Sequence, residues 1–181
     1  MNRLIGIALL LIAAPVAAQK VTIDYAKDID FNSVKTFQYV PSEDGAPDPL
    51  MAERIDALIK QKLVDGGLKE VTENPDIFVT YHLTAQQNQV LNTTGFGYGG
   101  YGPGWGAWGG AGLSTATTTV STYTEGTLIV DAYRASDKKL VWRGTGTDTV
   151  SGKPEKRTKQ VESVLNKLGD RWQRILKNEG K

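Results

Sequence analysis

The sequence contains no cysteine and only one histidine among its 181 residues. The absence of cysteine excludes disulfide bonds, thiolate nucleophiles, cysteine-based metal sites and lipid attachment to an N-terminal cysteine. A single histidine, with no cysteine or second histidine to join it, does not supply the ligands of an ordinary zinc site. The fold must therefore be held together by packing alone, and we expect neither a metal nor a cofactor.

The chain also has no large net charge of either sign, because 21 Lys and Arg residues nearly balance 20 Asp and Glu residues. A protein with a net charge near zero has no overall electrostatic attraction to nucleic acid. Beyond residue 18, no apolar run is long enough to cross a bilayer. The sequence thus predicts no nucleic-acid partner and no transmembrane span in the mature protein.

The first 18 residues have the pattern of a cleavable secretory signal peptide. A short positive start containing Arg3 is followed by an apolar run, residues 4–14, and then by Pro15 and the small residues 16–18. This order of regions is typical of export signals. We expect a mature protein that begins near Gln19, is exported to the periplasm and is not a lipoprotein.

Hydrophobic periodicity divides residues 19–181 into strands and two helices of a single domain. Alternating residues predict strands at 21–25, 31–40, 68–71 and 77–91, further strands at 114–123 and 127–134, and a last strand at 139–150 that forms a hairpin with 127–134. Asp48 and Pro49 predict a helix start, Gly66 and Gly67 its end, and helical spacing returns from Pro154. The expected fold class is α+β: a two-layer arrangement with a largely antiparallel sheet and two amphipathic helices packed on one face.

Residues 95–112 form a segment of unusual composition, which we call the glycine/aromatic segment. Its 18 positions hold ten glycines and five aromatic residues, with no charge. So many glycines exclude a helix and predict a long, flexible loop inserted in the domain. Aromatic side chains bury well against a protein, a glycan or the membrane interface. The candidate binding residues here are Phe96, Tyr98, Tyr101, Trp105 and Trp108.

Four groups of residues, found in order along the chain, resemble one known family. The groups are Asp24-Tyr25 with Asp30-Phe31 and Lys35-Thr36-Phe37, then Asn74-Pro75-Asp76-Ile77-Phe78-Val79, then Gly126-Thr127-Leu128-Ile129-Val130-Asp131, then Leu140-Val141-Trp142-Arg143-Gly144. Together they resemble the bacterial envelope family named domain of unknown function 4136. The resemblance implies a Gram-negative periplasmic or outer-membrane-associated protein with a two-layer α/β domain, and it implies no activity. Many members look like lipoproteins, whereas this chain lacks the cysteine that would be acylated, which favours a soluble periplasmic protein.

Other candidate chemistry is better explained by structural roles. His82 is expected on the less apolar face of its strand, and Asp24, Asp28 and Asp30 are better explained by turns than by calcium. Glu125 and Asp131 are placed near one another on adjoining strands, but one such pair among 20 acids is expected by chance. The Gly-x-Gly-x-x-Gly pattern at residues 95–100 lacks the following helix that a dinucleotide site requires.

Trp142 and Arg143 are the remaining candidates. Strand alternation places Leu140, Trp142 and Gly144 on one face, and Val141, Arg143 and Thr145 on the other. We expect Trp142 to pack under a helix and Arg143 to pair with an acid such as Asp131 across the hairpin. A binding role for Arg143 is the alternative.

The sequence contains no catalytic constellation, so the leading hypothesis is a non-enzymatic binding or interaction module of the cell envelope. Its partner would be an envelope protein, a glycan or the membrane interface, contacted through residues 95–112. A small-ligand or lipid carrier, with an apolar groove between helix 154–178 and the sheet, is the alternative. A hydrolase using carboxylates such as Glu125 and Asp131 is a third, weaker hypothesis.

Overall fold

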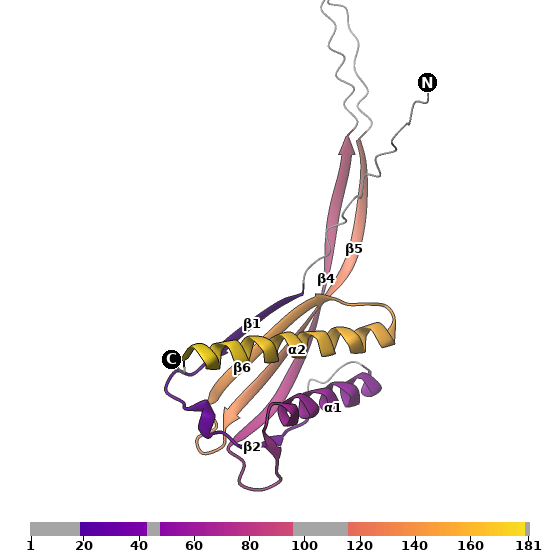
Figure 1. Cartoon of the computed structure of the whole chain (residues 1–181). Coiled ribbons are helices and arrows are strands. Elements are labelled where there is room, and N and C mark those ends of the chain that lie inside the picture. The colour runs from indigo at the N-terminus through magenta and orange to yellow at the C-terminus, as the bar shows by residue number, and fades with distance from the viewer. Residues whose placement is uncertain (1–18, 43–47, 96–115, 180–181) are drawn as a thin grey trace, which may run out of the picture.

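The computed structural model describes residues 19–42, 48–95 and 116–179, and these form a six-stranded mixed sheet and two α-helices (Figure 1). The elements are, in order, β1 Lys20–Tyr25, the 3-10 turn η1 Phe31–Ser33, β2 Thr36–Tyr39, α1 Pro49–Asp65, β3 Lys69–Glu70, β4 Ile77–Gly95, β5 Ala116–Arg134, β6 Leu140–Thr149 and α2 Pro154–Glu179. The sheet order is β1-β6-β5-β4-β2-β3. All pairings are antiparallel except those of β2, which runs parallel to β3 and β4. The predicted α+β class is confirmed, with a mixed sheet.

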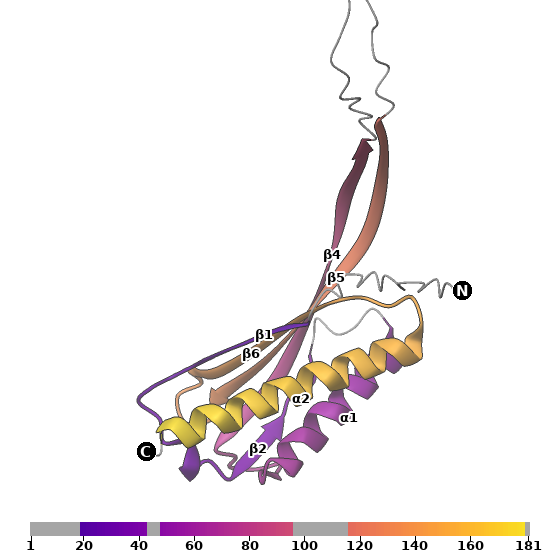
Figure 2. The ribbon, with the colours of Figure 1, turned by 45° about the horizontal axis from the view of Figure 1, so that its top comes forward.

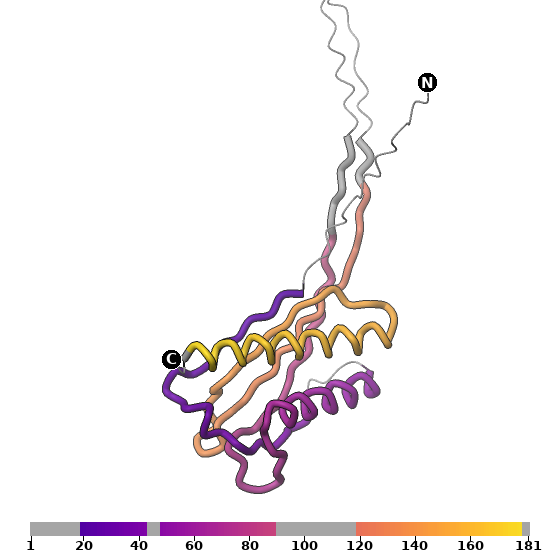
Figure 3. Tube along the Cα trace, viewed as in Figure 1, coloured from indigo at the N-terminus to yellow at the C-terminus, as the bar shows by residue number. Residues whose placement is uncertain are grey.

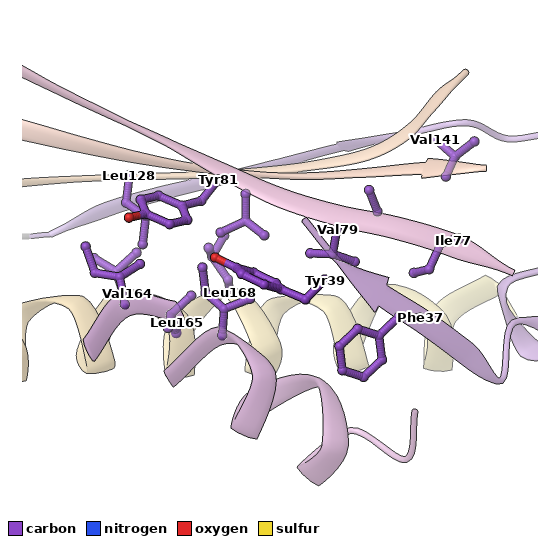
Figure 4. Packing of buried hydrophobic residues seen from close by; sticks show 14 of the residues in the cluster. Phe37, Tyr39, Ile77, Val79, Tyr81, Leu128, Val141, Val164, Leu165 and Leu168 are labelled. Carbon is purple, nitrogen blue, oxygen red and sulfur yellow. The ribbon is translucent and has the colours of Figure 1, made fainter. Parts of the chain in front are cut away.

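Both helices lie along the same side of the sheet, as the two views of the ribbon and the Cα trace show (Figures 1, 2 and 3). The hydrophobic core fills the space between the sheet and the two helices (Figure 4). Helix α1 contributes Met51, Ile55 and Ile59, and α2 contributes three further buried residues, Val164, Leu165 and Leu168. The sheet meets them with Phe37, Tyr39, Ile77, Val79, Tyr81, Leu128, Val130, Ala132 and Val141. Neither helix, among the described residues, has the length and apolar content needed to cross a membrane.

The ends of α1 follow the local signals in the sequence. The Asp48 side chain accepts a hydrogen bond from the backbone N–H of Leu50 at 3.1 Å, and Pro49 occupies the first turn. The helix ends at Gly66, and Gly67 adopts a left-handed conformation with φ of 92° that favours glycine. The predicted start and end of this helix are therefore confirmed.

The strand predicted over residues 31–40 is wrong in its first half. Asp30 accepts a hydrogen bond from the N–H of Asn32 at 2.9 Å, and residues Phe31–Ser33 form a 3-10 turn instead. The short polar side chain of Asp30 caps this turn, which is a local preference that competes with strand pairing. Only Thr36–Tyr39 enters the sheet, as β2.

Strand β5 is one continuous strand, where the sequence suggested two, at 114–123 and 127–134. Gly126 pairs in register with Ala85 of β4, so the ladder passes through the glycine without a break. Strand β4 likewise continues beyond the expected end at Leu91, to Gly95. Both strands are long because the backbone N–H and C=O groups of each find hydrogen-bond partners in the other from Ile77↔Arg134 to Gly95↔Ala116.

The faces of β6 differ from simple alternation at its start. The register between β5 and β6 shifts between Ala132 and Tyr133, so that Trp142 pairs with Ala132 while Leu140 pairs with Tyr133. This β-bulge inserts Val141 as an extra residue. Val141 is consequently buried in the core, and Leu140 is 41% exposed, so the prediction that Val141 shares a face with Arg143 is wrong.

Candidate functional site

Strands β4 and β5 extend well beyond the rest of the sheet and form a projecting arm (Figure 1). The last β6 residue in register with β5 is Thr149, opposite Glu125, and the N–H of Val150 then donates to the carbonyl of Thr124 at 2.8 Å. Beyond this point nine residue pairs of β4 and β5 continue without a third strand from the described part of the chain, from Gln87↔Thr124 to Gly95↔Ala116. We call residues 87–95 and 116–124 the arm. Nine residues of antiparallel strand span roughly 30 Å.

The end of the arm carries the glycine/aromatic segment, because residues 96–115 join Gly95 of β4 to Ala116 of β5. The candidate binding residues Phe96, Tyr98, Tyr101, Trp105 and Trp108 lie outside the described residues. The described strands therefore fix where this segment is attached: at the outer end of the arm, away from the helices (Figure 2). Its role in binding stays a prediction.

Arg143 lies on the sheet face opposite the helices, and it forms an ion pair with Asp131 across the β5–β6 hairpin. The Arg143 Nε donates to Asp131 Oδ1 at 2.7 Å, and Nη2 donates to Oδ2 at 2.6 Å. The two residues face each other in the ladder. This two-pronged geometry is the strong form of an arginine–carboxylate interaction. The expected Asp131–Arg143 pairing is confirmed.

The environments of the two charged groups are unequal. The Asp131 side chain is 0% exposed, whereas that of Arg143 is 43% exposed. Hydrogen bonds from the guanidinium to Asp131 are the main reason why the pKa of Arg143 lies above its ordinary value, while burial acts in the opposite direction. A buried carboxylate depends on its partner more than a half-exposed guanidinium does.

Three further polar side chains surround the pair. The Tyr133 hydroxyl donates to Asp131 Oδ2 at 3.4 Å, and His82 Nε2 lies 3.9 Å from the same oxygen. Asp24 of β1 is the cross-strand neighbour of Arg143. Burial, followed by the negative charge of Asp131, raises the pKa of Tyr133. The expectation that His82 lies on the polar face of its strand is confirmed, and four strands contribute to this cluster.

Trp142 lies close to α2, as expected. Its ring makes an edge-on contact with Trp172 of α2, with ring centroids 6.1 Å apart. Tyr25 and Phe31 also make edge-on contacts with Trp172, at 5.1 and 4.9 Å. The aromatic cluster thus joins β1, the 3-10 turn, β6 and α2.

The carboxylates considered for catalysis or metal binding are not brought together. Glu125 and Asp131 lie on the same strand, β5, and not on adjoining strands as the sequence suggested. Six residues along a strand separate them by roughly 20 Å, well beyond the spacing of a glycosidase pair. Asp30 caps a turn, as predicted. Within the described ranges, no three His, Asp or Glu side chains gather in a way that could hold a metal ion.

A cavity lies between the N-terminal halves of the two helices and the sheet. It has a volume of about 180 Å³. Its apolar walls come from α1, α2, β4 and β5, and they include Met51, Ile55, Leu83, Leu128, Val161 and Val164. Arg157 also lines it, and the buried Nε atom of Arg157 has no hydrogen-bond partner among the described residues.

Two glycines of β6 make room for bulky side chains, one for Val164 of α2 and the other for the Trp142 ring. A Cβ atom on Gly146 would lie 2.1 Å from Cγ1 of Val164, and one on Gly144 would lie 2.4 Å from the Trp142 ring. The close packing at these two glycines was not predicted from the sequence. The signal was present, since alternate glycines inside a strand mark one face that another element approaches closely.

The family model described as domain of unknown function (DUF4136) matches residues 21–168. No curated protein is a match. Among solved structures, a PDZ domain protein from Parabacteroides distasonis is similar at 12% identity with a TM-score of 0.50, over 81% of this chain and 35% of that one. The chain therefore spans about a third of that protein, and the likeness concerns the fold alone. A PelC dodecamer from Paraburkholderia phytofirmans matches at 13% identity and a TM-score of 0.46, over 84% of this chain and 98% of that chain.

Proposed function

This chain belongs to the DUF4136 family, and we propose that it is a non-enzymatic binding module of the bacterial cell envelope. The observation that carries the proposal is the arm. Strands β4 and β5 leave the body of the sheet as a continuous ladder of pairs, and their outer end is joined by the glycine/aromatic segment. The signal-like residues 1–18 support export to the periplasm.

The chemistry of the segment suits contact with an uncharged or amphipathic surface. Tyr and Trp rings combine a large apolar area with a polar group that stays hydrated, which favours protein hot spots, glycans and the membrane interface. Glycine between the rings lets the backbone adapt to a partner. The body serves as a scaffold that presents this segment at a distance from its helices.

Replacement of the five aromatic residues of the segment by serine tests the proposal. The matched control replaces three exposed apolar residues of the body, Leu50, Val64 and Leu140, by serine. We expect the first variant to lose association with the envelope and capture of cross-linked partners, and the control to keep both. Circular dichroism establishes that both variants are folded. If a folded five-serine variant associates with the envelope as the native protein does, the proposal is wrong.

The cavity supports a second candidate function, the carriage of a small amphipathic molecule. Its apolar walls suit a short hydrocarbon or aromatic group, and the Nε of Arg157, which has no hydrogen-bond partner among the described residues, suits an anionic group. Native mass spectrometry of protein purified from the periplasm tests this function. The carrier proposal expects a bound small molecule that is absent from a Val161→Phe variant and retained in an exposed Leu50→Phe control. Native protein without any bound molecule would exclude it.

A further inference from the structure

Among the described residues, the outer edge of β5 along the arm has no pairing strand. On that side the last hydrogen bond comes from Val150, just after β6, whose N–H donates to the carbonyl of Thr124. Backbone groups of alternate residues point to the same side of a strand. The N–H and C=O groups of Thr122 and Val120 therefore point to the same edge as those of Thr124, and no described strand pairs with them there.

This edge lacks the features that usually protect an exposed strand. Charged side chains, proline or a β-bulge normally prevent another strand from adding to an edge. No charged residue occurs anywhere from Leu83 to Thr124, and neither strand of the arm contains proline. The pairing of β4 with β5 also shows no register shift. The edge is therefore a long, regular and uncharged template.

The residues of this edge strongly favour β structure. The stretch from Thr117 to Thr124 reads Thr-Thr-Thr-Val-Ser-Thr-Tyr-Thr, which is almost entirely β-branched or aromatic. Val120 stands at the middle of the arm strand and is 55% exposed. The arm strand of β4 instead includes Gln87, Asn88 and Gln89, and asparagine is depleted in strands. A two-stranded ribbon is only marginally stable in water, and additional strands stabilise it.

We propose that a second copy of this chain pairs antiparallel with the β5 edge, with a two-fold axis at Val120. In this register residue 118 faces residue 122 of the second copy and Val120 faces Val120, while Thr124 keeps its hydrogen bond with Val150. Each outward-pointing residue from Thr118 to Thr122 then meets another such residue. The result is a four-stranded sheet in the order β4-β5-β5-β4.

Several observations favour a second copy as the occupant. An uncharged strand meets its own copy without the repulsion that like charges would cause. A two-fold contact uses the same surface on both chains and closes at two copies, so it leaves no β5 edge open. It also brings the exposed Val120 side chains of the two chains side by side, which removes apolar area from water.

Sedimentation velocity of residues 19–181, at roughly 1 to 100 µM, tests the proposal with a proline at the axis. We expect the native chain to form a dimer and Val120→Pro to weaken dimerisation at least about tenfold, because proline removes the N–H at the axis. The Val120 N–H points away from β4, so the arm itself keeps its ladder. A Val120→Thr control retains the N–H and the branched side chain, and should dimerise like the native chain. A native chain that stays monomeric throughout, or a Val120→Pro variant that dimerises as well as the native chain, overturns the proposal.

A single introduced cysteine tests the register directly, since the native chain has none. Directly opposed Cα atoms in a hydrogen-bonded pair lie about 5.5 Å apart, within disulfide range. Val120→Cys should therefore cross-link to its own copy on oxidation. Thr122→Cys, also exposed, is the matched control, because its copy would lie roughly 14 Å away in this register. Equal cross-linking of both variants, or species larger than a dimer, would refute the two-fold contact centred on Val120.

Discussion

The Asp131–Arg143 pair predicts an asymmetry that can be measured. Substitution of Arg143 by methionine removes the partner of a carboxylate that is 0% exposed. The remaining neighbours of Asp131 Oδ2 are the Tyr133 hydroxyl at 3.4 Å and His82 Nε2 at 3.9 Å, too distant to replace two bonds of 2.6–2.7 Å. We expect the free energy of unfolding to fall by about 3 kcal/mol, at the low end for a broken buried pair because the arginine is half in water.

Substitution of Asp131 by alanine should cost less, although it breaks the same pair. The Arg143 side chain is already 43% exposed, so it can turn further into water when its partner is lost. We expect a loss of about 1 to 2 kcal/mol, made up of a weak exposed ion pair and a small cavity. The double variant should be about as stable as Asp131→Ala alone, because it leaves no buried charge.

Urea unfolding followed by far-UV circular dichroism at pH 7 measures all three variants. The comparison depends on the midpoints and requires unchanged slopes, which report an unchanged unfolded state. A larger loss for Asp131→Ala than for Arg143→Met would refute the reasoning. So would a double variant that is less stable than Arg143→Met, because the cost would then not come from an unpaired carboxylate.

Three other predictions follow from packing and from charge. Gly146→Ala should lower the free energy of unfolding by about 1–3 kcal/mol, because its Cβ would lie 2.1 Å from Val164. Gly169 is exposed on α2 with nothing within 4 Å of an added Cβ, so Gly169→Ala should raise the free energy of unfolding by about 0.5–1 kcal/mol. Thermal melts of the two variants test this difference. Trp172→Ala should cost about 3 kcal/mol through the loss of its contacts with Tyr25, Phe31 and Trp142, and a Trp172→Phe variant that is equally unstable would argue against ring contacts as the cause. Hydrogen bonds from the Lys35 N–H, then from the Thr36 hydroxyl and N–H, lower the pKa of Asp76, so its contribution to stability is present above the unfolded pKa and is lost as the pH falls through the folded one. Asp76→Asn should therefore flatten the acid side of the stability profile, and an unchanged profile would contradict this.

Features that depend on neighbouring residues were predictable from the sequence. The start of α1 at Asp48 and Pro49 rests on a capping bond within three residues. Alternation in β4 correctly placed His82 on the less apolar face, opposite the buried Val79 and Tyr81. The Asp131–Arg143 pair was predictable because a hairpin with a short turn brings the two residues opposite each other.

Features that depend on the choice of a distant partner were not predictable in the same way. The parallel pairing of β2 with β4 joins residues about 40 positions apart, and no local pattern specifies it. The bulge at Val141 is a mismatch between two strands, so alternation within either strand gives no sign of it. Separate strands were predicted at 114–123 and 127–134, but β4 supplies partners for the residues between them, including Gly126. The cavity arises only when α1, α2 and the sheet meet.

The division of β4 and β5 into a packed half and a projecting half bears directly on the proposed binding function. In the body these strands bury Val79, Tyr81, Leu128 and Val130, so packing against the helices fixes their register. The ladder continues unbroken from there to Gly95 and Ala116. The arm has no covering helix among the described residues (Figures 1 and 2), so its order depends on this anchored register and on whatever pairs with its edges. A core substitution that loosens the register, such as Val130→Ala, should therefore weaken binding at the end of the arm, although Val130 itself lies in the body. An equally destabilising substitution at the C-terminal end of α2 should leave that binding unchanged.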